Sequence, residues 1–346
     1  MRRIGPNGFA IPFGLTAFGG TWLAAADARW APRAVGEALF LVAAAVWVAL
    51  VVAYGAHVAT RPGRLRADLT HPVLAPFAGL VTATPMVLVA RGLAPYAPVV
   101  ATAATGVLIG LTVLHGAWLT GQLICSDLGL EQFHPGYLIP VLAGGLLASI
   151  AAAQVGQVGL AWALFGLGTI GWLVVGSIVL GRLFLGPRLP THLVPTLAIE
   201  VAPSAVAGLA WFSLNGGRID AVAHLLAGFG LFMVLVQVRL LPAFVRLRFS
   251  MGFWAFTFPW SAVATVALHW IAQTRPVGGD LAAALVLAAT SLLVGGIVVR
   301  TAVALRRGTL FPHEDATAAP APRPSPHHPS PHHPSPHHPS HRRRPA

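Results

Sequence analysis

The chain has 346 residues, of which 56% are hydrophobic and only 9% are charged, and its formal net charge is +12. A soluble globular domain carries about 25% charged residues, so this composition excludes both a water-soluble domain and a disordered chain. The single cysteine, Cys125, excludes a disulfide framework and cysteine-based zinc sites. All 22 basic residues are arginines scattered between apolar runs, which indicates membrane topology rather than nucleic-acid binding.

Ten apolar stretches are long enough to cross a bilayer, which takes roughly 20 helical residues each. Proline, glycine and arginine separate them, and the first stretch lacks the small-residue cleavage site of a signal peptide. The predicted spans are residues 8–26, 35–59, 72–91, 95–122, 135–154, 157–181, 193–214, 219–241, 250–273 and 280–306. We therefore expect residues 1–312 to form one all-α integral membrane domain.

The arginines between the spans predict the orientation of the chain. An even number of spans places both termini on one side, and that side carries thirteen arginines against five on the other. Short cytoplasmic loops are enriched in arginine, so both termini are expected in the cytoplasm, with the protein in the inner or plasma membrane. The five arginines of the other side are Arg29, Arg33, Arg91, Arg218 and Arg275.

The segment 313–346 has a different composition, with Ser-Pro-His-His-Pro repeated from Ser325, Ser330 and Ser335. It has little apolar content to bury, so we expect a disordered cytoplasmic tail. Metal binding by this tail is one interpretation, and a solvated extension with adventitious metal affinity is the other. Removal of the tail is expected to leave folding, assembly and transport intact.

Proline placement divides the spans into two classes. Every odd-numbered span has a proline inside its apolar run, whereas the even-numbered spans have none in their interiors. Interior proline kinks a helix and frees a carbonyl group, which needs a partner within the protein or beside water. The pattern predicts five helical hairpins, with kinked odd helices around a pore and smooth even helices outside. The five prolines are Pro12, Pro85, Pro140, Pro203 and Pro259.

The ninth span carries two phenylalanines on opposite helix faces, Phe256 and Phe258. Phe258 shares its face with small or hydroxylated residues, whereas Phe256 shares its face with bulky aromatic ones. We therefore expect Phe258 to face the lumen, with ordinary core packing as the alternative. The residues expected beside Phe258 on the lumen are Ser261, Ala262 and Thr265.

Several motifs in order along the spans resemble one known family. They are Gly8-Phe-Ala-Ile-Pro-Phe-Gly14, Ala45-Val-Trp47, Thr70-His-Pro72, His134-Pro-Gly-Tyr-Leu-Ile-Pro140, Ala202-Pro203, Arg239-Leu-Leu-Pro242 and Gly252-Phe-Trp-Ala-Phe-Thr-Phe258. Over about residues 5–311 the chain resembles the tellurite-resistance/dicarboxylate transporter family, whose relatives include bacterial tellurite-resistance protein A and plant guard-cell slow anion channels.

The resemblance implies five helical hairpins in quasi-fivefold arrangement around a central pore, usually in a homotrimer with one pore per subunit. It implies that Phe258 is the gate across the pore. It also implies that Pro12, Pro85, Pro140 and Pro203 are kinking prolines, with Pro259 shared by only some relatives. Glu200 departs from the family pattern, which has an apolar residue there.

Ionisable residues at membrane depth are costly and are candidates for function. Glu200 is interpreted either as a pore-related, titrating group or as a neutral structural acid. Arg239 is expected to end the eighth helix at the cytoplasmic interface, or else to add positive potential at the pore mouth. His115 and His224 are interpreted as packing histidines.

The leading hypothesis is a gated passive pathway for small anions such as chloride and nitrate, with oxyanions such as tellurite as further candidates. The alternatives are a proton-coupled dicarboxylate (malate-type) carrier or sulfite exporter titrating at Glu200, and a non-conducting membrane protein whose tail binds metal or a partner. No catalytic, phosphate-binding or metal-ligand motif is present in the sequence, so neither an enzyme nor a cofactor is predicted. The expected partners are small anions, the lipid bilayer and further copies of the chain, without nucleic acid.

Overall fold

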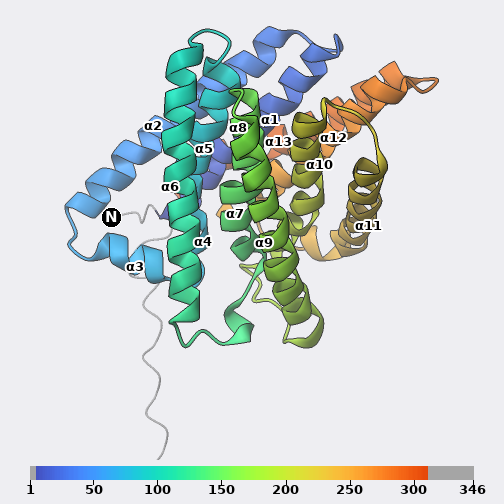
Figure 1. The fold of residues 1–346 in the computed structure, drawn as a ribbon. Coiled ribbons are helices and arrows are strands. Elements are labelled where there is room, and N and C mark those ends of the chain that lie inside the picture. The colour runs from blue at the N-terminus through green and yellow to red at the C-terminus, as the bar shows by residue number, and fades with distance from the viewer. Residues whose placement is uncertain (1–4, 311–346) are drawn as a thin grey trace, which may run out of the picture.

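Ten helical segments long and apolar enough to cross a membrane run through residues 5–310, the part of the chain that the computed structural model describes (Figure 1). They are Pro6–Asp27, Arg33–Ala59, Ala75–Leu93, Pro98–Ile124, Pro135–Gln154, Val158–Leu185, Val194–Asn215, Ala221–Phe244, Met251–Thr274 and Gly279–Arg306. Every boundary lies within four residues of the predicted one. The predicted all-α, ten-span fold is confirmed. The Pro/His-rich segment 313–346 lies outside the described residues, so the expectations for it stay predictions.

Each even-numbered span is one continuous α-helix. These helices are α2 (Arg33–Ala59), α6 (Pro98–Ile124), α9 (Val158–Leu185), α11 (Ala221–Phe244) and α13 (Gly279–Arg306). Helix α11 continues past the predicted end at residue 241 and includes Pro242 near its C-terminus. The even spans are therefore not wholly free of proline, although no proline interrupts the middle of any of them.

Each odd-numbered span changes its helix type along its length. Spans one, seven and nine begin as 3₁₀-helices and continue as α-helices: η1 (Pro6–Phe9) with α1 (Ala10–Asp27), η6 (Val194–Val201) with α10 (Ala202–Asn215), and η7 (Met251–Phe256) with α12 (Thr257–Thr274). Span three comprises α4 (Ala75–Ala78), α5 (Leu80–Val87) and the π-helix η2 (Leu88–Leu93). Span five comprises η4 (Pro135–Tyr137), α7 (Leu138–Val141), the π-helix η5 (Leu142–Leu147) and α8 (Ala148–Gln154).

The changes of helix type lie close to the five odd-span prolines. Pro12, Pro203 and Pro259 stand in the first three residues of an α-helix, directly after a 3₁₀-helical segment, and the first turn of an α-helix is where proline is best tolerated. Pro85 and Pro140 lie inside α5 and α7, and each is followed within three residues by a π-helical turn. Proline inside a helix removes one backbone bond, and the wider π-turn accommodates the resulting mismatch.

Outer helices supply polar partners to these irregular inner segments. Pro85 cannot donate to the carbonyl of Val81, and the Trp47 indole of α2 donates to that oxygen at 2.9 Å. Likewise the Gln237 amide of α11 donates to the Leu197 carbonyl of η6 at 2.8 Å. Backbone groups that are free at membrane depth need such partners because lipid offers none. The kinked helices are thus stabilised from outside by the smooth ones.

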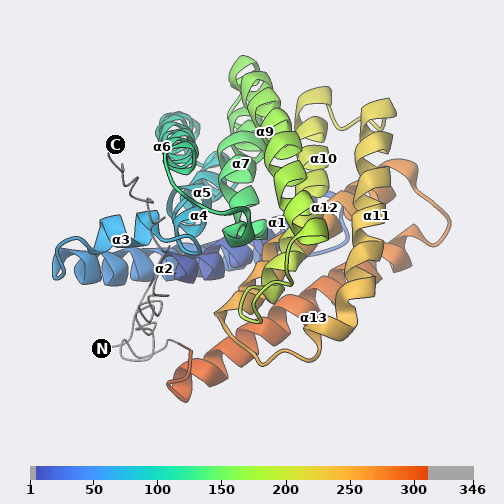
Figure 2. The same ribbon diagram turned by 90° about the horizontal axis from the view of Figure 1, so that it is seen from below.

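The two classes of helix differ in their burial. In the most apolar stretch of each span, 44–83% of residues are buried in the odd spans and only 17–28% in the even spans. Figure 2 shows α1 and α12 in the middle of the molecule, with α2, α6, α9, α11 and α13 around them. The predicted arrangement of kinked helices inside and smooth helices outside is confirmed. Segment α3 (Arg64–Thr70) connects spans two and three, and η3 (Leu130–Gln132) connects spans four and five. Both lie on the face of the molecule where the odd-numbered spans begin.

Candidate functional site

A cavity of about 450 Å³ lies between the five odd spans. All five of them contribute to its wall, and none of the even spans does. Its lining includes Asp27, Gln154, Ser213 and Ala272, which lie at or near the ends of α1, α8, α10 and α12. These spans run in the same direction, so the cavity extends to the face where they end. We call it the outer vestibule.

A second cavity of about 30 Å³ lies near the beginnings of the same spans, and its wall is almost wholly apolar. Phe13, Leu147 and Phe258 line both cavities and therefore separate them. The rings of Phe13 and Phe258 are stacked, with centroids 4.4 Å apart and planes 25° apart. We call these three residues the constriction.

The backbone that carries the stacked pair is held by close packing of α1 on the ninth span. Gly14 faces Thr257, and a Cβ atom at this position would clash with the threonine side chain and crowd the Trp254 ring. Thr257 Oγ1 donates to the Trp254 carbonyl at 2.8 Å, and the Trp254 indole donates to Thr301 of α13 at 3.0 Å. The backbone beside Phe13 and Phe258 is therefore held by contacts among α1, the ninth span and α13.

The predicted lumen residues of the ninth span occupy different places. Ala262 and Thr265 line the outer vestibule, and Pro259 lines the smaller cavity. Ser261 is fully buried and is not among the lining residues of either cavity in the described part of the chain. Its carbonyl instead accepts a hydrogen bond from Thr21 of α1 at 3.0 Å.

The other phenylalanine of the ninth span lies away from both cavities. Phe256 packs edge-on against Phe244 of α11, with ring centroids 4.9 Å apart, and against Phe253 at 5.8 Å. It belongs to an apolar cluster that contains residues of α11 and α13. The two faces distinguished in the sequence thus carry rings in different surroundings.

Two further residues singled out in the sequence do not reach the cavities in the described structure. Glu200 lies in η6, is only 6% exposed, and its Oε1 has no hydrogen-bond partner among the described residues. Arg239 is exposed on the outer helix α11. Neither side chain is among those that line the two cavities.

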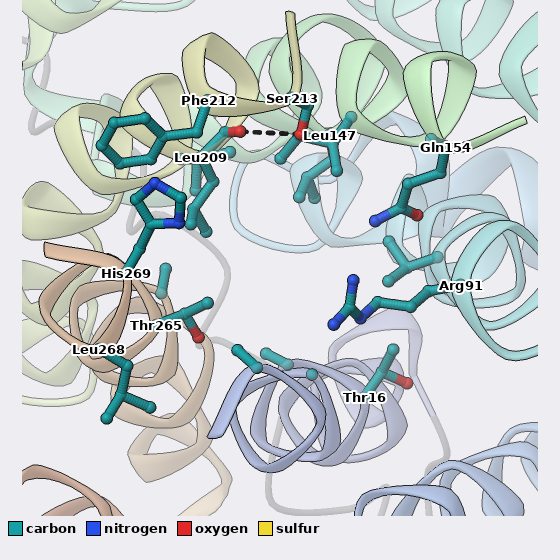
Figure 3. Close-up of a pocket in the computed structure, with 18 of the residues that line it drawn as sticks. Thr16, Arg91, Leu147, Gln154, Leu209, Phe212, Ser213, Thr265, Leu268 and His269 are labelled. Atoms are coloured by element: carbon teal, nitrogen blue, oxygen red, sulfur yellow. Dashed lines mark hydrogen bonds between the residues drawn. The ribbon is translucent and has the colours of Figure 1, made fainter. Parts of the chain in front are cut away.

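Apart from Thr265, the polar side chains of the outer vestibule were not among the predicted site residues. Figure 3 shows Arg91 and Gln154 pointing into the vestibule from one side, with His269 on the opposite side. Arg91 Nη2 donates to Asp27 Oδ2 at 2.7 Å, and His269 stacks on Phe212 with centroids 3.9 Å apart. The position of Arg91 at the end of an inner span is the signal that could have identified it. Among the described residues, no group of three or more His, Cys, Asp or Glu side chains is arranged to hold a metal.

Comparison with known proteins agrees with the family resemblance of the sequence motifs. A family model described as a voltage-dependent anion channel, SLAC1, matches residues 3–304. The chain is 28% identical to a tellurite resistance protein TehA homolog of Haemophilus influenzae over 318 residues, covering 88% of this chain and 92% of that protein. It is 32% identical to the S-type anion channel SLAH1 of Arabidopsis thaliana over 193 residues, covering 55% of this chain and 48% of SLAH1. The guard cell S-type anion channel SLAC1 of the same plant is 29% identical over 209 residues, covering 59% of this chain and 36% of that channel.

Proposed function

The chain belongs to the SLAC1 family of voltage-dependent anion channels, and from this premise we propose that its ten helices form a gated membrane pathway for small anions such as chloride and nitrate. In this proposal the anion moves along the axis that the odd spans surround, through the outer vestibule, the constriction and the smaller cavity. Phe258 is the gate, and Phe13 and Leu147 complete the closed constriction. The supporting observation is that these three side chains line both cavities.

A phenyl ring is an effective barrier because it offers an anion no hydrogen-bond donor and displaces the water that would hydrate it. Transfer of a charge from water to an apolar wall costs several kcal/mol at least. The smaller cavity behind the ring is also apolar, so the barrier extends beyond the gate itself. Opening then requires the Phe258 ring to leave the axis, which ends its stacking on Phe13.

Selectivity in this pathway rests on positive potential and pore width, because an anion that binds too tightly would not leave. Thr16 and Thr265 add hydroxyl groups to the vestibule wall, and Arg91 adds a cation. Tellurite is a further candidate anion, on the strength of the name of the Haemophilus influenzae relative.

The arginine distribution supports cytoplasmic termini, and in this proposal the outer vestibule opens on the opposite side of the inner or plasma membrane. The outer helices expose many large apolar side chains, as helices in contact with lipid or with other subunits do. The family resemblance favours a homotrimer with one pathway in each subunit.

Voltage-clamp recording with anion replacement tests the proposal directly. A channel gives currents that reverse at the equilibrium potential of the permeant anion and shift with its gradient. Currents that ignore the anion gradient, or solute flux that follows the proton gradient alone, would contradict a passive pathway.

The second candidate function is proton-coupled carriage of a dicarboxylate such as malate, or sulfite export. The observation that favours it is Glu200, a buried carboxyl group whose Oε1 has no partner among the described residues. If Glu200 exchanges a proton during transport, Glu200→Gln should flatten the pH dependence of flux at unchanged expression. An unaltered pH profile in that variant would leave Glu200 as a structural acid.

A further inference from the structure

The wall of the outer vestibule holds a cation whose hydrogen-bonding capacity is only partly used. Arg91 lies in the π-helix η2, and its side chain is 29% exposed. Within the described residues the guanidinium makes one hydrogen bond, from Nη2 to Asp27 Oδ2. Its other N–H groups have no protein acceptor there and point into the vestibule (Figure 3). A π-turn rotates the residues that follow it relative to an α-helix, and such turns are frequent at functional sites.

A second donor lies on the same side of the vestibule. Gln154 ends α8, which packs against η2, and its amide points into the cavity in Figure 3. Its side chain makes no hydrogen bond to the described residues, and it lines the vestibule together with Arg91. A guanidinium and a carboxamide with unused N–H groups are the donors that bind a small anion in a partly desolvated place.

The carboxylate beside Arg91 is already shared with another cation. Asp27 Oδ1 accepts from Arg33 Nη1 at 2.9 Å, while Oδ2 accepts from Arg91. Arg33 also contacts Glu37 at 3.1 Å, so the four charged groups form a chain that leads away from the vestibule wall, where Asp27 and Arg91 lie. The two arginines balance the two carboxylates in number, but Arg91 is the cation of this chain that lines the cavity. An anion in the vestibule would therefore compete with Asp27 for Arg91.

We propose that Arg91 and Gln154 form a binding site for a small anion in the outer vestibule, with Asp27 as an internal competitor that keeps binding weak. The site rests on the proposed function and adds to it a place where the anion is held before the gate. A planar oxyanion such as nitrate suits the fork of guanidinium donors, because two parallel N–H···O bonds can form. Chloride, a single-atom acceptor, uses the charge but not the fork.

Two variants change the site in opposite directions. Arg91→Gln removes the cation and should weaken nitrate binding about two- to fivefold, the range expected for a partly exposed charge pair. Asp27→Asn removes the competitor and should strengthen binding by a similar factor. Arg91→Lys keeps the charge without the fork, so it should retain chloride binding and lose the preference for nitrate.

The first measurement is the thermal unfolding of the full chain in detergent, with nitrate replacing gluconate at constant ionic strength. A ligand that binds the folded state raises the unfolding temperature as its concentration passes the dissociation constant. We expect the nitrate concentration of half-maximal shift to rise in Arg91→Gln and fall in Asp27→Asn. Arg275→Gln removes an arginine from the same face outside the cavity and should behave as wild type. If the nitrate concentration of half-maximal shift is the same in Arg91→Gln, Arg275→Gln and wild type, the proposed site is wrong.

The second measurement is the nitrate dependence of conductance in a channel opened by Phe258→Ala. The nitrate concentration on the vestibule side that gives half-maximal conductance should rise when Arg91→Gln is added and fall when Asp27→Asn is added. Unchanged half-saturation in both would overturn the proposal. If Phe258→Ala fails to conduct, the proposed gate is wrong, and the unfolding measurement still decides whether the anion site exists.

Discussion

Phe13 offers a sharp test of how the constriction is held closed. In the described structure its ring stacks on Phe258 at 4.4 Å, and it lines both cavities. Phe13→Ala removes the ring against which Phe258 rests while leaving Phe258 itself in place. If opening means that the Phe258 ring leaves the axis, the stacking stabilises only the closed state. Its loss should therefore shift the equilibrium toward the open state.

The size of this shift follows from the geometry of the pair. An aromatic pair contributes about 0.5–1.5 kcal/mol beyond simple burial. A difference of about 1.4 kcal/mol is tenfold in an equilibrium constant, so the open fraction should rise about two- to tenfold. The effect should be smaller than that of Phe258→Ala, because the Phe258 ring still obstructs the axis for part of the time.

The assay is macroscopic anion current at matched surface expression. Phe18→Ala is the control, because Phe18 lies on the same helix α1 with nearly equal burial, and its ring contacts Trp22 outside the cavities. If Phe13 acts mainly through Phe258, Phe13→Ala should raise the current by a smaller factor in the Phe258→Ala background than in the wild-type background. Current in Phe13→Ala equal to wild type, or equal to that of Phe18→Ala, would refute the reasoning.

Two further predictions concern the stability of the scaffold. Gly145→Ala should lower the unfolding temperature, because the added Cβ would lie 2.1 Å from the Gly168 backbone of α9 and overpacking costs about 1–3 kcal/mol. Gly166→Ala is the matched control, because open space surrounds its added Cβ. Equal unfolding temperatures of the two variants would contradict this prediction. Burial lowers the pKa of His134 to about 4, with Arg182 and His192 acting in the same direction. Below about pH 6.5 the imidazole is protonated in the unfolded chain but stays neutral in the folded chain. The contribution of His134 to the free energy of unfolding is therefore complete above about pH 6.5 and is lost toward pH 4, by up to about 1.4 kcal/mol per pH unit. His134→Asn should flatten the decline in unfolding temperature between about pH 7 and pH 5, and an identical decline in both proteins would exclude His134 as its source.

The number, limits and layering of the helices could be predicted because each depends on local chemistry. A run of about 20 apolar residues has few alternatives to a membrane helix. Proline in the middle of such a run demands a partner for the freed carbonyl, and Trp47 provides one for the carbonyl freed by Pro85. These requirements act over a few residues and are therefore visible in the sequence.

The faces of the irregular inner segments could not be predicted so well. Glu200 lies in the 3₁₀-helix η6, which turns about 120° per residue instead of the 100° of an α-helix. Over several residues this difference moves a side chain to another face. Ser261 lies at the edge of the predicted lumen face, and the close approach of α1, where Thr21 bonds its carbonyl, buries it.

Contacts between residues of distant spans also could not be predicted from the sequence. The Phe13–Phe258 stacking joins residues 245 positions apart, and no local pattern indicates it. Arg182 is one of the thirteen arginines whose positions after the predicted spans indicate the cytoplasmic side. In the structure it is 2% exposed, and its guanidinium donates to the carbonyls of Pro187 and Glu131. A buried cation satisfied by backbone carbonyls leaves no signature in the sequence.

The central claim is that Phe258 closes the anion pathway, and a pair of recordings on Phe258→Ala and Phe256→Ala at matched surface expression tests it most directly. Phe258 stands between the two cavities, whereas Phe256 is buried against Phe244, where truncation typically costs about 3–5 kcal/mol of stability. The account predicts large constitutive anion conductance in Phe258→Ala, and a destabilised protein without such conductance in Phe256→Ala. Wild-type conductance in Phe258→Ala, or an open pathway in Phe256→Ala instead, would contradict it.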